Sequence, residues 1–563
     1  MKPQITGSEA LMLSLLNEGV DTIFGYPGGQ IMPVYDALYD YRDRLNHILV
    51  RHEQGATHSA QGYARVSGKV GVALVTSGPG ATNTITGIAD AMLDSTPMVV
   101  IAGQVPSEML GTDAFQETDL VGITQPVAKW AYQIRRAEDI AWAVARAFYI
   151  ARSGRPGPVI LDMAKDAQIQ KVDFEYKKCS YIRSYIPVPE LDLAQISAAA
   201  KKIDSAKKPL ALIGQGVILS GAEQELRAFL EKTGIPAAST LLGLSALPSD
   251  YPLNMGMLGM HGNIAPNLKT NECDVLIAIG MRFNERVTGS LKAYAKQAEI
   301  IHIDIDESEI GKNVTVHLPV LADAKMALAA ITKKVKPNKH TDWVNSFKEY
   351  ENQELECVIK PELFPKEGQI KMGEVVNKVT EATGNKAVLV TDVGQNQMFA
   401  ARYFKYSVSH SVVTSGGLGT MGFGIPAAIG AKIGAPERTV CLFCGDGGFQ
   451  MTIQELGTIM QSRVGVKMIL LNNSYLGMVR QWQELFWNKR YSFTEMANPN
   501  FVEIAKAYGI KSKEVEKRED LDGAIAEMLA DDEAFLLVVK VENEGKVYPM
   551  IPAGKSICDL LVQ

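Results

Sequence analysis

The sequence predicts an α/β protein with three domains, each a doubly wound parallel sheet covered by helices. Short apolar runs alternate with helix-like stretches along the 563 residues, as expected when crossover helices join parallel strands. The clearest runs in the first domain are 22–24, 71–75, 98–101 and 159–161. Two polar segments with prolines, 171–189 and 333–365, indicate linkers. The predicted domains are therefore 1–170, 190–332 and 366–563.

In the first domain, a carboxylate follows an apolar run. Glu53 comes just after the run 48–50 and begins a helix-like segment that ends near Arg65. Ligands of open parallel sheets bind outside the carboxyl ends of the strands, which is where this residue is expected. An exposed helix cap would have the same pattern, so Glu53 alone does not decide between the two interpretations.

The middle domain contains glycines and acids at strand ends. The run 209–213 leads into Gly214-x-Gly216, and later strands end at Gly280 and carry Asp304. A dinucleotide could be bound here, with its phosphates near the glycines and a ribose near the acid. Ordinary structural turns explain the glycines equally well.

The last domain carries the most specific motif. A strand candidate, 439–444, precedes Gly445-Asp446-Gly447-Gly448, and a second, 466–471, delivers Asn472 and Asn473. The free N–H groups of a helix expected from 449 onward would favour an anion. One carboxylate and one amide oxygen, completed by phosphate oxygens and water, suit Mg²⁺ better than zinc. Two unrelated turns are the alternative.

Composition narrows the class of protein. Lys and Arg total 57 against 63 Asp and Glu, a net charge of −6, and no basic stripe is interleaved with aromatics, so nucleic acid is not an expected partner. The sequence has no run of ~18 apolar residues and no secretory or transit pattern near Met1, so we expect a cytoplasmic protein that does not bind membranes. Six scattered cysteines suit reduced thiols.

Glu53 and the Asp446/Asn473 motif together resemble the thiamin diphosphate-dependent enzymes. Over almost the whole chain, the sequence is similar to the catalytic subunits of acetohydroxyacid synthase, also called acetolactate synthase. Six blocks carry this resemblance: 25–29, 51–55, 76–83, 111–119, 415–422 and 477–483. The resemblance implies the three-domain architecture of these enzymes, with pyrimidine-binding, FAD-binding and diphosphate-binding domains in that order.

The resemblance also assigns roles to residues. Glu53 would bond the pyrimidine ring nitrogen of thiamin diphosphate and drive loss of the proton from carbon 2, with Gln116 and Lys165 as further catalytic residues. Met421 would be the apolar wedge that bends the cofactor. Magnesium would be bound at Asp446, Asn473 and Tyr475. The other residues expected at thiamin diphosphate are Gly29, Gln395, Gly419, Gly445, Gly447, Gly448, Tyr475, Gly477 and Met478.

A flavin site and a substrate site follow from the same resemblance. The residues expected at FAD are Arg155, Gly214, Gly216, His261, Gly280, Arg282, Asp304 and Asp323. The flavin would take no part in the net reaction, which consumes no reducing equivalents. Phe115 and Trp482 would line the substrate crevice, where one additional apolar contact would favour 2-ketobutyrate as acceptor.

The expected reaction is decarboxylation of pyruvate and transfer of its two-carbon unit to pyruvate or 2-ketobutyrate, the first common step of branched-chain amino-acid synthesis. Because Glu53 and Asp446 lie in different domains, a homodimer or homotetramer with each cofactor between two subunits is expected. A small regulatory subunit is a further expected partner. The alternatives are a flavin-dependent pyruvate oxidase, a flavin-free acetolactate synthase and a catalytically inactive nucleotide-binding regulator.

Overall fold

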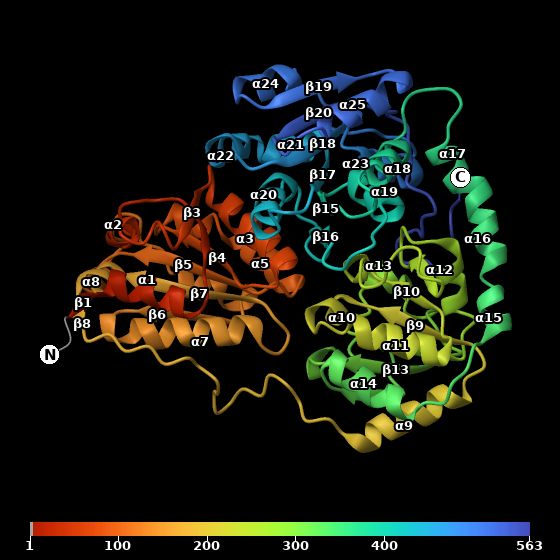
Figure 1. Ribbon diagram of the computed structural model, residues 1–563, viewed down its shortest axis with the longest axis horizontal. Coiled ribbons are helices and arrows are strands. Elements are labelled where there is room, and N and C mark those ends of the chain that lie inside the picture. The colour runs from red at the N-terminus through yellow and green to blue at the C-terminus, as the bar shows by residue number, and fades with distance from the viewer. Residues whose placement is uncertain (1–3, 563) are drawn as a thin grey trace.

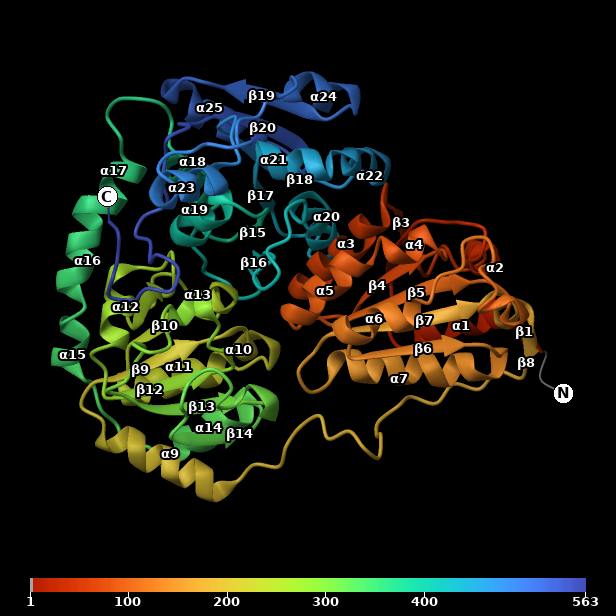
Figure 2. The ribbon, with the colours of Figure 1, turned by 180° about the vertical axis from the view of Figure 1, so that it is seen from behind.

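The computed structural model describes residues 4–562 and contains three six-stranded parallel sheets. Figures 1 and 2 show the N-terminal domain (red to orange) at one side and the central and C-terminal domains stacked at the other. Helices cover both faces of the sheets, which confirms the predicted fold class.

The N-terminal sheet has the strand order β3-β2-β4-β5-β7-β6. Its strands are β2 (Thr22–Gly25), β3 (Asn46–Leu49), β4 (Gly71–Val75), β5 (Met98–Gln104), β6 (Trp130–Ile134) and β7 (Pro158–Ala164). Its helices are α1 (Gly7–Asn17), α2 (Met32–Tyr39), α3 (Glu53–Ser67), α4 (Pro79–Thr82), α5 (Ile85–Leu93), α6 (Leu120–Thr124), α7 (Ile140–Arg152) and α8 (Lys165–Ile169). A separate antiparallel pair joins β1 (Ile5–Thr6) to β8 (Lys171–Val172).

The central sheet has the order β11-β10-β9-β12-β13-β14, which is the 3-2-1-4-5-6 winding of dinucleotide-binding domains. Its strands are β9 (Pro209–Ile213), β10 (Ala237–Ser239), β11 (Asn254–Met257), β12 (Val275–Ile279), β13 (Glu299–Asp304) and β14 (Leu318–Leu321). Its helices are α9 (Leu193–Ser205), α10 (Gln215–Leu219), α11 (Glu223–Thr233), α12 (Ile264–Thr270), α13 (Glu285–Thr288) and α14 (Ala324–Lys334). The winding reverses between β9 and β12, where such sheets bind their ligand.

The C-terminal sheet has the order β16-β15-β17-β18-β20-β19. Its strands are β15 (Val388–Thr391), β16 (Val412–Val413), β17 (Val440–Gly445), β18 (Val466–Asn472), β19 (Lys511–Val515) and β20 (Phe535–Lys540). Its helices are α18 (Met372–Ala382), α19 (Gln395–Tyr403), α20 (Gly424–Gly434), α21 (Asp446–Met451), α22 (Leu456–Ser462), α23 (Gly477–Phe486), α24 (Phe501–Ala507) and α25 (Leu521–Met528). Numbered along the chain, this winding and that of the N-terminal sheet are both 2-1-3-4-6-5.

The two polar segments differ from each other. Residues 173–192 contain no helix or strand apart from an isolated bridge between Ile182 and Tyr185. The segment 333–365 instead forms α15 (Thr341–Asn345), α16 (Lys348–Glu354) and α17 (Lys360–Leu363). Trp343 and Phe347 are buried there against one face of the central sheet, so this connection is helical and packed because it has apolar anchors.

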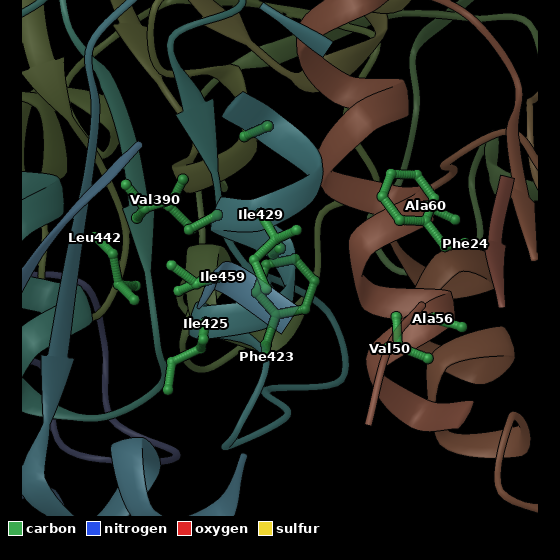
Figure 3. Close-up of a cluster of buried hydrophobic side chains, with 14 of the residues drawn as sticks. Phe24, Val50, Ala56, Ala60, Val390, Phe423, Ile425, Ile429, Leu442 and Ile459 are labelled. Carbon is green, nitrogen blue, oxygen red and sulfur yellow. The ribbon is translucent and has the colours of Figure 1, made fainter. Parts of the chain in front are cut away.

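The N-terminal and C-terminal domains share one apolar core. Figure 3 shows part of it, with Phe24, Val50, Ala56 and Ala60 on one side and Val390, Phe423, Ile425, Ile429, Leu442 and Ile459 on the other. Helices α3 and α20 pack closely because they meet at glycines: a Cβ added to Gly62 would lie 2.0 Å from Ala427 O, and one added to Gly430 would lie 1.8 Å from Ser59 O. The two sheets are therefore connected within one chain through the packed pair α3 and α20.

Candidate functional site

The carboxyl edge of the N-terminal sheet presents Glu53. The residue is the first of α3, directly after β3, and its side chain is half-buried. The helix begins here because the His52 side chain caps it, accepting the Gln54 N–H at 3.1 Å. An acid in the first turn is also favoured by the helix dipole. Asn83 Nδ2 donates to Glu53 Oε2 at 2.9 Å and orients the carboxylate.

Four more predicted residues lie at this edge. Lys165 Nζ donates to the carbonyl of Gly29 at 3.2 Å, which joins the ends of β7 and β2. Gln116 lies on the loop after β5 with a positive φ of 62°, and a Cβ added to Gly78 would come within 2.9 Å of its carbonyl. Its neighbour Phe115 is 83% exposed. The edge therefore combines one acid, one base and an uncovered aromatic ring.

Asp446 and Asn473 lie at the carboxyl edge of the C-terminal sheet, after the adjacent strands β17 and β18. Asp446 accepts from Asn498 Nδ2 at 2.6 Å and from the Gly447 N–H at 3.0 Å. Asn473 accepts from the Tyr475 N–H at 3.1 Å. Asp446 itself is the first residue of α21, which begins three residues earlier than the sequence predicted.

Glycines let this edge pack tightly around its polar groups. A Cβ added to Gly477 would lie 2.1 Å from Gln395 Oε1, and one added to Gly448 would lie 2.2 Å from Asp392 Oδ1. Gly447 lies beside the Met421 side chain, whose Cε would be 3.6 Å from an added Cβ. Gly445 ends β17 and Gly419 has a positive φ of 72° in the loop before Met421. The predicted thiamin diphosphate residues of this domain thus gather at one edge.

Asp446 has the properties of a ligand for a cation. The residue is 1% exposed, and burial raises the pKa of its carboxyl although the Asn498 hydrogen bond acts in the opposite direction. Among residues 4–562 there is no cluster of three or more His, Cys, Asp or Glu side chains that could bind a metal. A cation at Asp446 and Asn473 would therefore need further oxygen ligands from a bound molecule or from water, which fits Mg²⁺ with a diphosphate.

Three site residues were missed by sequence reasoning. Asp392 is buried and accepts from the Gly422 N–H at 3.0 Å and the Gly424 N–H at 2.9 Å, so it fixes the turn after Met421. Its position directly after the apolar run 388–391 was an available signal. Asn498 and Glu455 had no such signal, because their partners, Asp446 and Arg51, are distant in the sequence.

Glu455 connects the two domains at the start of α3. It is fully buried, and its two carboxylate oxygens accept from the Arg51 N–H at 3.1 and 3.3 Å. Burial raises its pKa, while hydrogen bonds from Thr458 and Arg51 lower it. The C-terminal domain of the chain therefore fixes the backbone just before Glu53.

A cavity of about 970 Å³ opens at the carboxyl edge of the central sheet. Eight predicted residues line it: Arg155, Gly214, Gly216, His261, Gly280, Arg282, Asp304 and Asp323. The glycines let two strand ends approach, since a Cβ added to Gly214 would lie 2.0 Å from Gly280 O. The cavity therefore lies where the winding of the sheet reverses.

The charges of this cavity suit an anionic ligand on one wall. Arg282 has its pKa lowered by burial and by the neighbouring guanidinium of Arg155. Burial raises the pKa of Asp304 to about 6 and lowers that of His261 to about 3, so the imidazole is neutral. Arg155 Nη1 lies 2.8 Å from Glu309 and 3.2 Å from Asp306.

The cavity extends to the C-terminal domain. Gly419, Met478 and Trp482 contribute to its lining, so predicted thiamin, substrate and flavin residues share one continuous space. Trp482 packs against Phe486 with ring centroids 5.1 Å apart, and the Arg286 guanidinium lies 6.0 Å from its ring.

Glu53 and the Asp446/Asn473 pair have separate hydrogen-bond partners. In the part of the chain that the structure describes, no hydrogen bond or ion pair joins Glu53 to Asp446 or Asn473. Glu53 bonds within its own domain, and the start of α3 faces Glu455 instead.

Three parallel-sheet domains with an acid on the first edge and a Gly-Asp-Gly and Asn-Asn pair on the third define a thiamin diphosphate-binding class of enzyme. Three family descriptions of thiamine pyrophosphate enzymes match: the N-terminal TPP binding domain at residues 5–123, the central domain at 196–331 and the C-terminal TPP binding domain at 392–539.

Curated relatives narrow the class. The chain is 44% identical over 553 residues to the acetolactate synthase large subunit of Lactococcus lactis, covering 98% of this chain and 95% of that protein. It is 42% identical to the acetolactate synthase large subunit of Buchnera aphidicola, with 99% and 98% covered, and 41% identical to the isozyme 2 large subunit of Escherichia coli, with 99% of each covered. The chain belongs to the acetolactate synthase large subunit family of thiamin diphosphate-dependent enzymes. None of the helices in residues 4–562 is long and apolar enough to span a membrane.

Proposed function

We propose that this chain is the catalytic subunit of an acetolactate synthase, which decarboxylates pyruvate and transfers the two-carbon unit to pyruvate or 2-ketobutyrate. The observation that carries the proposal is the pairing of Glu53 on one sheet edge with Asp446 and Asn473 on another, in a chain of this family. Relatives over 40% identical along the full chain are named acetolactate synthases, which does not favour the pyruvate oxidase alternative.

Thiamin diphosphate, when bound, supplies the electron sink that lets a 2-keto acid lose carbon dioxide. Glu53 would hold a proton at the pyrimidine ring nitrogen, with Asn83 keeping its carboxylate in place. Met421 would be the wedge that bends the cofactor so that its two rings meet, supported by the turn that Asp392 fixes. The diphosphate would lie along Gly447, Gly448 and Gly477, where glycine lets the backbone approach a ligand closely.

Magnesium fits the third-domain edge. Asp446 is a buried carboxylate beside the amide of Asn473, a donor set of hard oxygens that suits a small divalent cation. The backbone of Tyr475, whose N–H is bonded to Asn473, belongs to the same turn. The cation would tie the diphosphate to the sheet.

FAD fits the cavity of the central domain. Its volume of about 970 Å³ is sufficient for a dinucleotide, and Gly214, Gly216 and Gly280 on its lining would present backbone to the phosphates. Burial and the repulsion from Arg155 lower the pKa of Arg282, and a bound diphosphate would offset this repulsion. Asp304 and Asp323 are suited to ribose hydroxyls.

The substrates would enter between two subunits. Phe115, Gln116 and Lys165 of one chain would face Met478 and Trp482 of another, because neither edge of a single chain has both groups. A homodimer or homotetramer is the assembly that completes the site. The relatives are named large subunits, which implies a small partner subunit for this chain, and a cytoplasmic location is part of the same proposal.

Product analysis tests the proposal. Purified protein with pyruvate, thiamin diphosphate and Mg²⁺ should form acetolactate; acetaldehyde or acetyl phosphate as the main product would refute it. Glu53→Gln should lower the rate by about 10²–10⁴-fold, the usual contribution of a general acid or base, while thiamin diphosphate still binds. Full activity in this variant would exclude Glu53 as the proton-relay residue.

A further inference from the structure

Two buried aspartates of the N-terminal domain bind a loop of the C-terminal domain. The loop, residues 414–420, connects β16 to the turn before α20 and carries Gly419. Asp90 lies on α5 and Asp94 directly follows it, and both are 0% exposed. Neither residue belongs to the site described above, and sequence reasoning did not single them out.

Asp94 uses both carboxylate oxygens on the loop backbone. Its Oδ2 accepts from the Gly416 N–H at 2.8 Å and its Oδ1 from the Gly417 N–H at 2.7 Å. Arg65 Nη2 donates to Oδ2 at 2.7 Å and neutralises the buried charge. Charge-assisted bonds of this kind are stronger than neutral ones, so Asp94 fixes two consecutive amides of the loop.

The fixed loop is a wall of the large cavity. Residues 415–419 line the cavity, and a Cβ added to Gly417 would lie 2.8 Å from Asp94 Oδ1 and 3.4 Å from Arg282 Nη2. Ser95, which follows Asp94 in the chain, accepts a hydrogen bond from Arg155 Nε at 2.9 Å. Asp94 and Ser95 of the N-terminal domain therefore contact both the loop before Met421 and the cavity residue Arg155.

We propose that Asp94 is a positioning residue that sets the loop 414–420, and through it the binding of both thiamin diphosphate and FAD. The loop lines the cavity and leads along the chain to Met421, so a displacement of Gly416 and Gly417 would move Gly419 and Met421 as well as the wall beside Arg282. This inference rests on the proposed function, because it concerns the same two cofactors.

Asp90 provides a matched control one helical turn earlier. Its Oδ1 accepts from the hydroxyls of Ser415 and Thr420, while its Oδ2 is buried without a partner among the described residues. Asparagine at 90 keeps the accepting oxygen, whereas asparagine at 94 must turn an NH₂ group toward a backbone N–H. Both aspartates are fully buried and both receive the same substitution, so a difference between the two variants reports the hydrogen bonds to the loop backbone.

The first test needs no cofactor. Amide hydrogen exchange at Gly416 and Gly417 should rise at least about 10-fold in Asp94→Asn and stay within about 3-fold of the unmodified protein in Asp90→Asn. The amides of Gly422 and Gly424, which Asp392 accepts, are the internal reference. Unchanged exchange at Gly416 and Gly417 in Asp94→Asn would overturn the proposal.

The second test measures both affinities by titration. Thiamin diphosphate with Mg²⁺, and separately FAD, should bind roughly 10- to 100-fold more weakly to Asp94→Asn, and less than about 3-fold more weakly to Asp90→Asn. Gly417→Ala, which pushes the loop off an intact carboxylate, should weaken both and replaces Asp94→Asn if that variant does not fold. Normal affinity in a variant with a released loop would refute positioning. Failure of the unmodified protein to bind thiamin diphosphate would instead refute the proposed function.

Discussion

The substitution Gly430→Ala tests whether the close contact of α3 and α20 determines the geometry of the site. The added Cβ would lie 1.8 Å from the carbonyl of Ser59, which belongs to the backbone of α3 and cannot rotate away. A normal carbon–oxygen contact is about 3.3 Å, so the helices must separate by about 1.5 Å. Helix α3 begins at Glu53, and α20 follows Met421 closely, so both residues should move.

The expected cost follows from two opposing contributions. Overpacking costs about 1–3 kcal/mol, and a backbone clash is at the upper end of this range. Alanine gains up to about 1 kcal/mol over glycine inside a helix. The net destabilisation is therefore about 2 kcal/mol, which corresponds to a fall in Tm of about 4–8 °C for a domain of this size.

Gly523→Ala is the matched control. Gly523 lies in α25, and a Cβ there would have no atom within 4 Å, so only the gain in helix propensity remains. Calorimetry should show the Tm of Gly430→Ala below, and that of Gly523→Ala equal to or above, the Tm of the unmodified protein. Thiamin diphosphate binding should weaken only in the first variant. Equal Tm values for the two variants would refute the argument from helix packing.

Two further predictions concern single carboxylates. Asp446→Asn should raise the Mg²⁺ concentration needed for thiamin diphosphate binding by about 10-fold or more, because a neutral amide replaces the buried anion; an unchanged Mg²⁺ midpoint in a fluorescence titration would contradict this. Burial raises the pKa of Glu362 to about 7 from 4.5, so the folded protein retains a proton that the unfolded chain loses, and stability falls as pH rises through this window. Glutamine cannot lose a proton, so Glu362→Gln should not share this loss. At ~1.4 kcal/mol per pKa unit, urea denaturation should show the free energy of unfolding of Glu362→Gln rising by about 3 kcal/mol relative to the unmodified protein between pH 4.5 and pH 8. A difference that stays constant with pH would argue against a neutral Glu362.

The sequence was informative for several site residues at strand ends, although Asp392, which directly follows β15, was missed. Asp446, Asn473 and Asp304 come at the ends of continuous apolar runs, and parallel strands bring such ends to one edge. The fold class follows from the same regularity, since apolar runs and helical stretches alternate along the whole chain.

Contacts made across domains were beyond sequence reasoning. Asp94 meets Gly416 and Gly417 across more than 300 positions of the chain, and Glu455 reaches Arg51 across more than 400. The segment 333–365, whose prolines and charges indicated a linker, forms helices because Trp343 and Phe347 are buried against the central domain. Such contacts depend on the packing of finished domains, which local pattern does not encode.

The first and third sheets wind in the same order, and the helices that join them, α3 and α20, each follow the second strand. Gene duplication followed by fusion around a central insert would leave this pattern. The two halves would then have begun as equivalent copies facing one another and later specialised, one retaining an acid at its edge and the other a cation site. On this account the proposed homodimer would bring together four descendants of one ancestral unit.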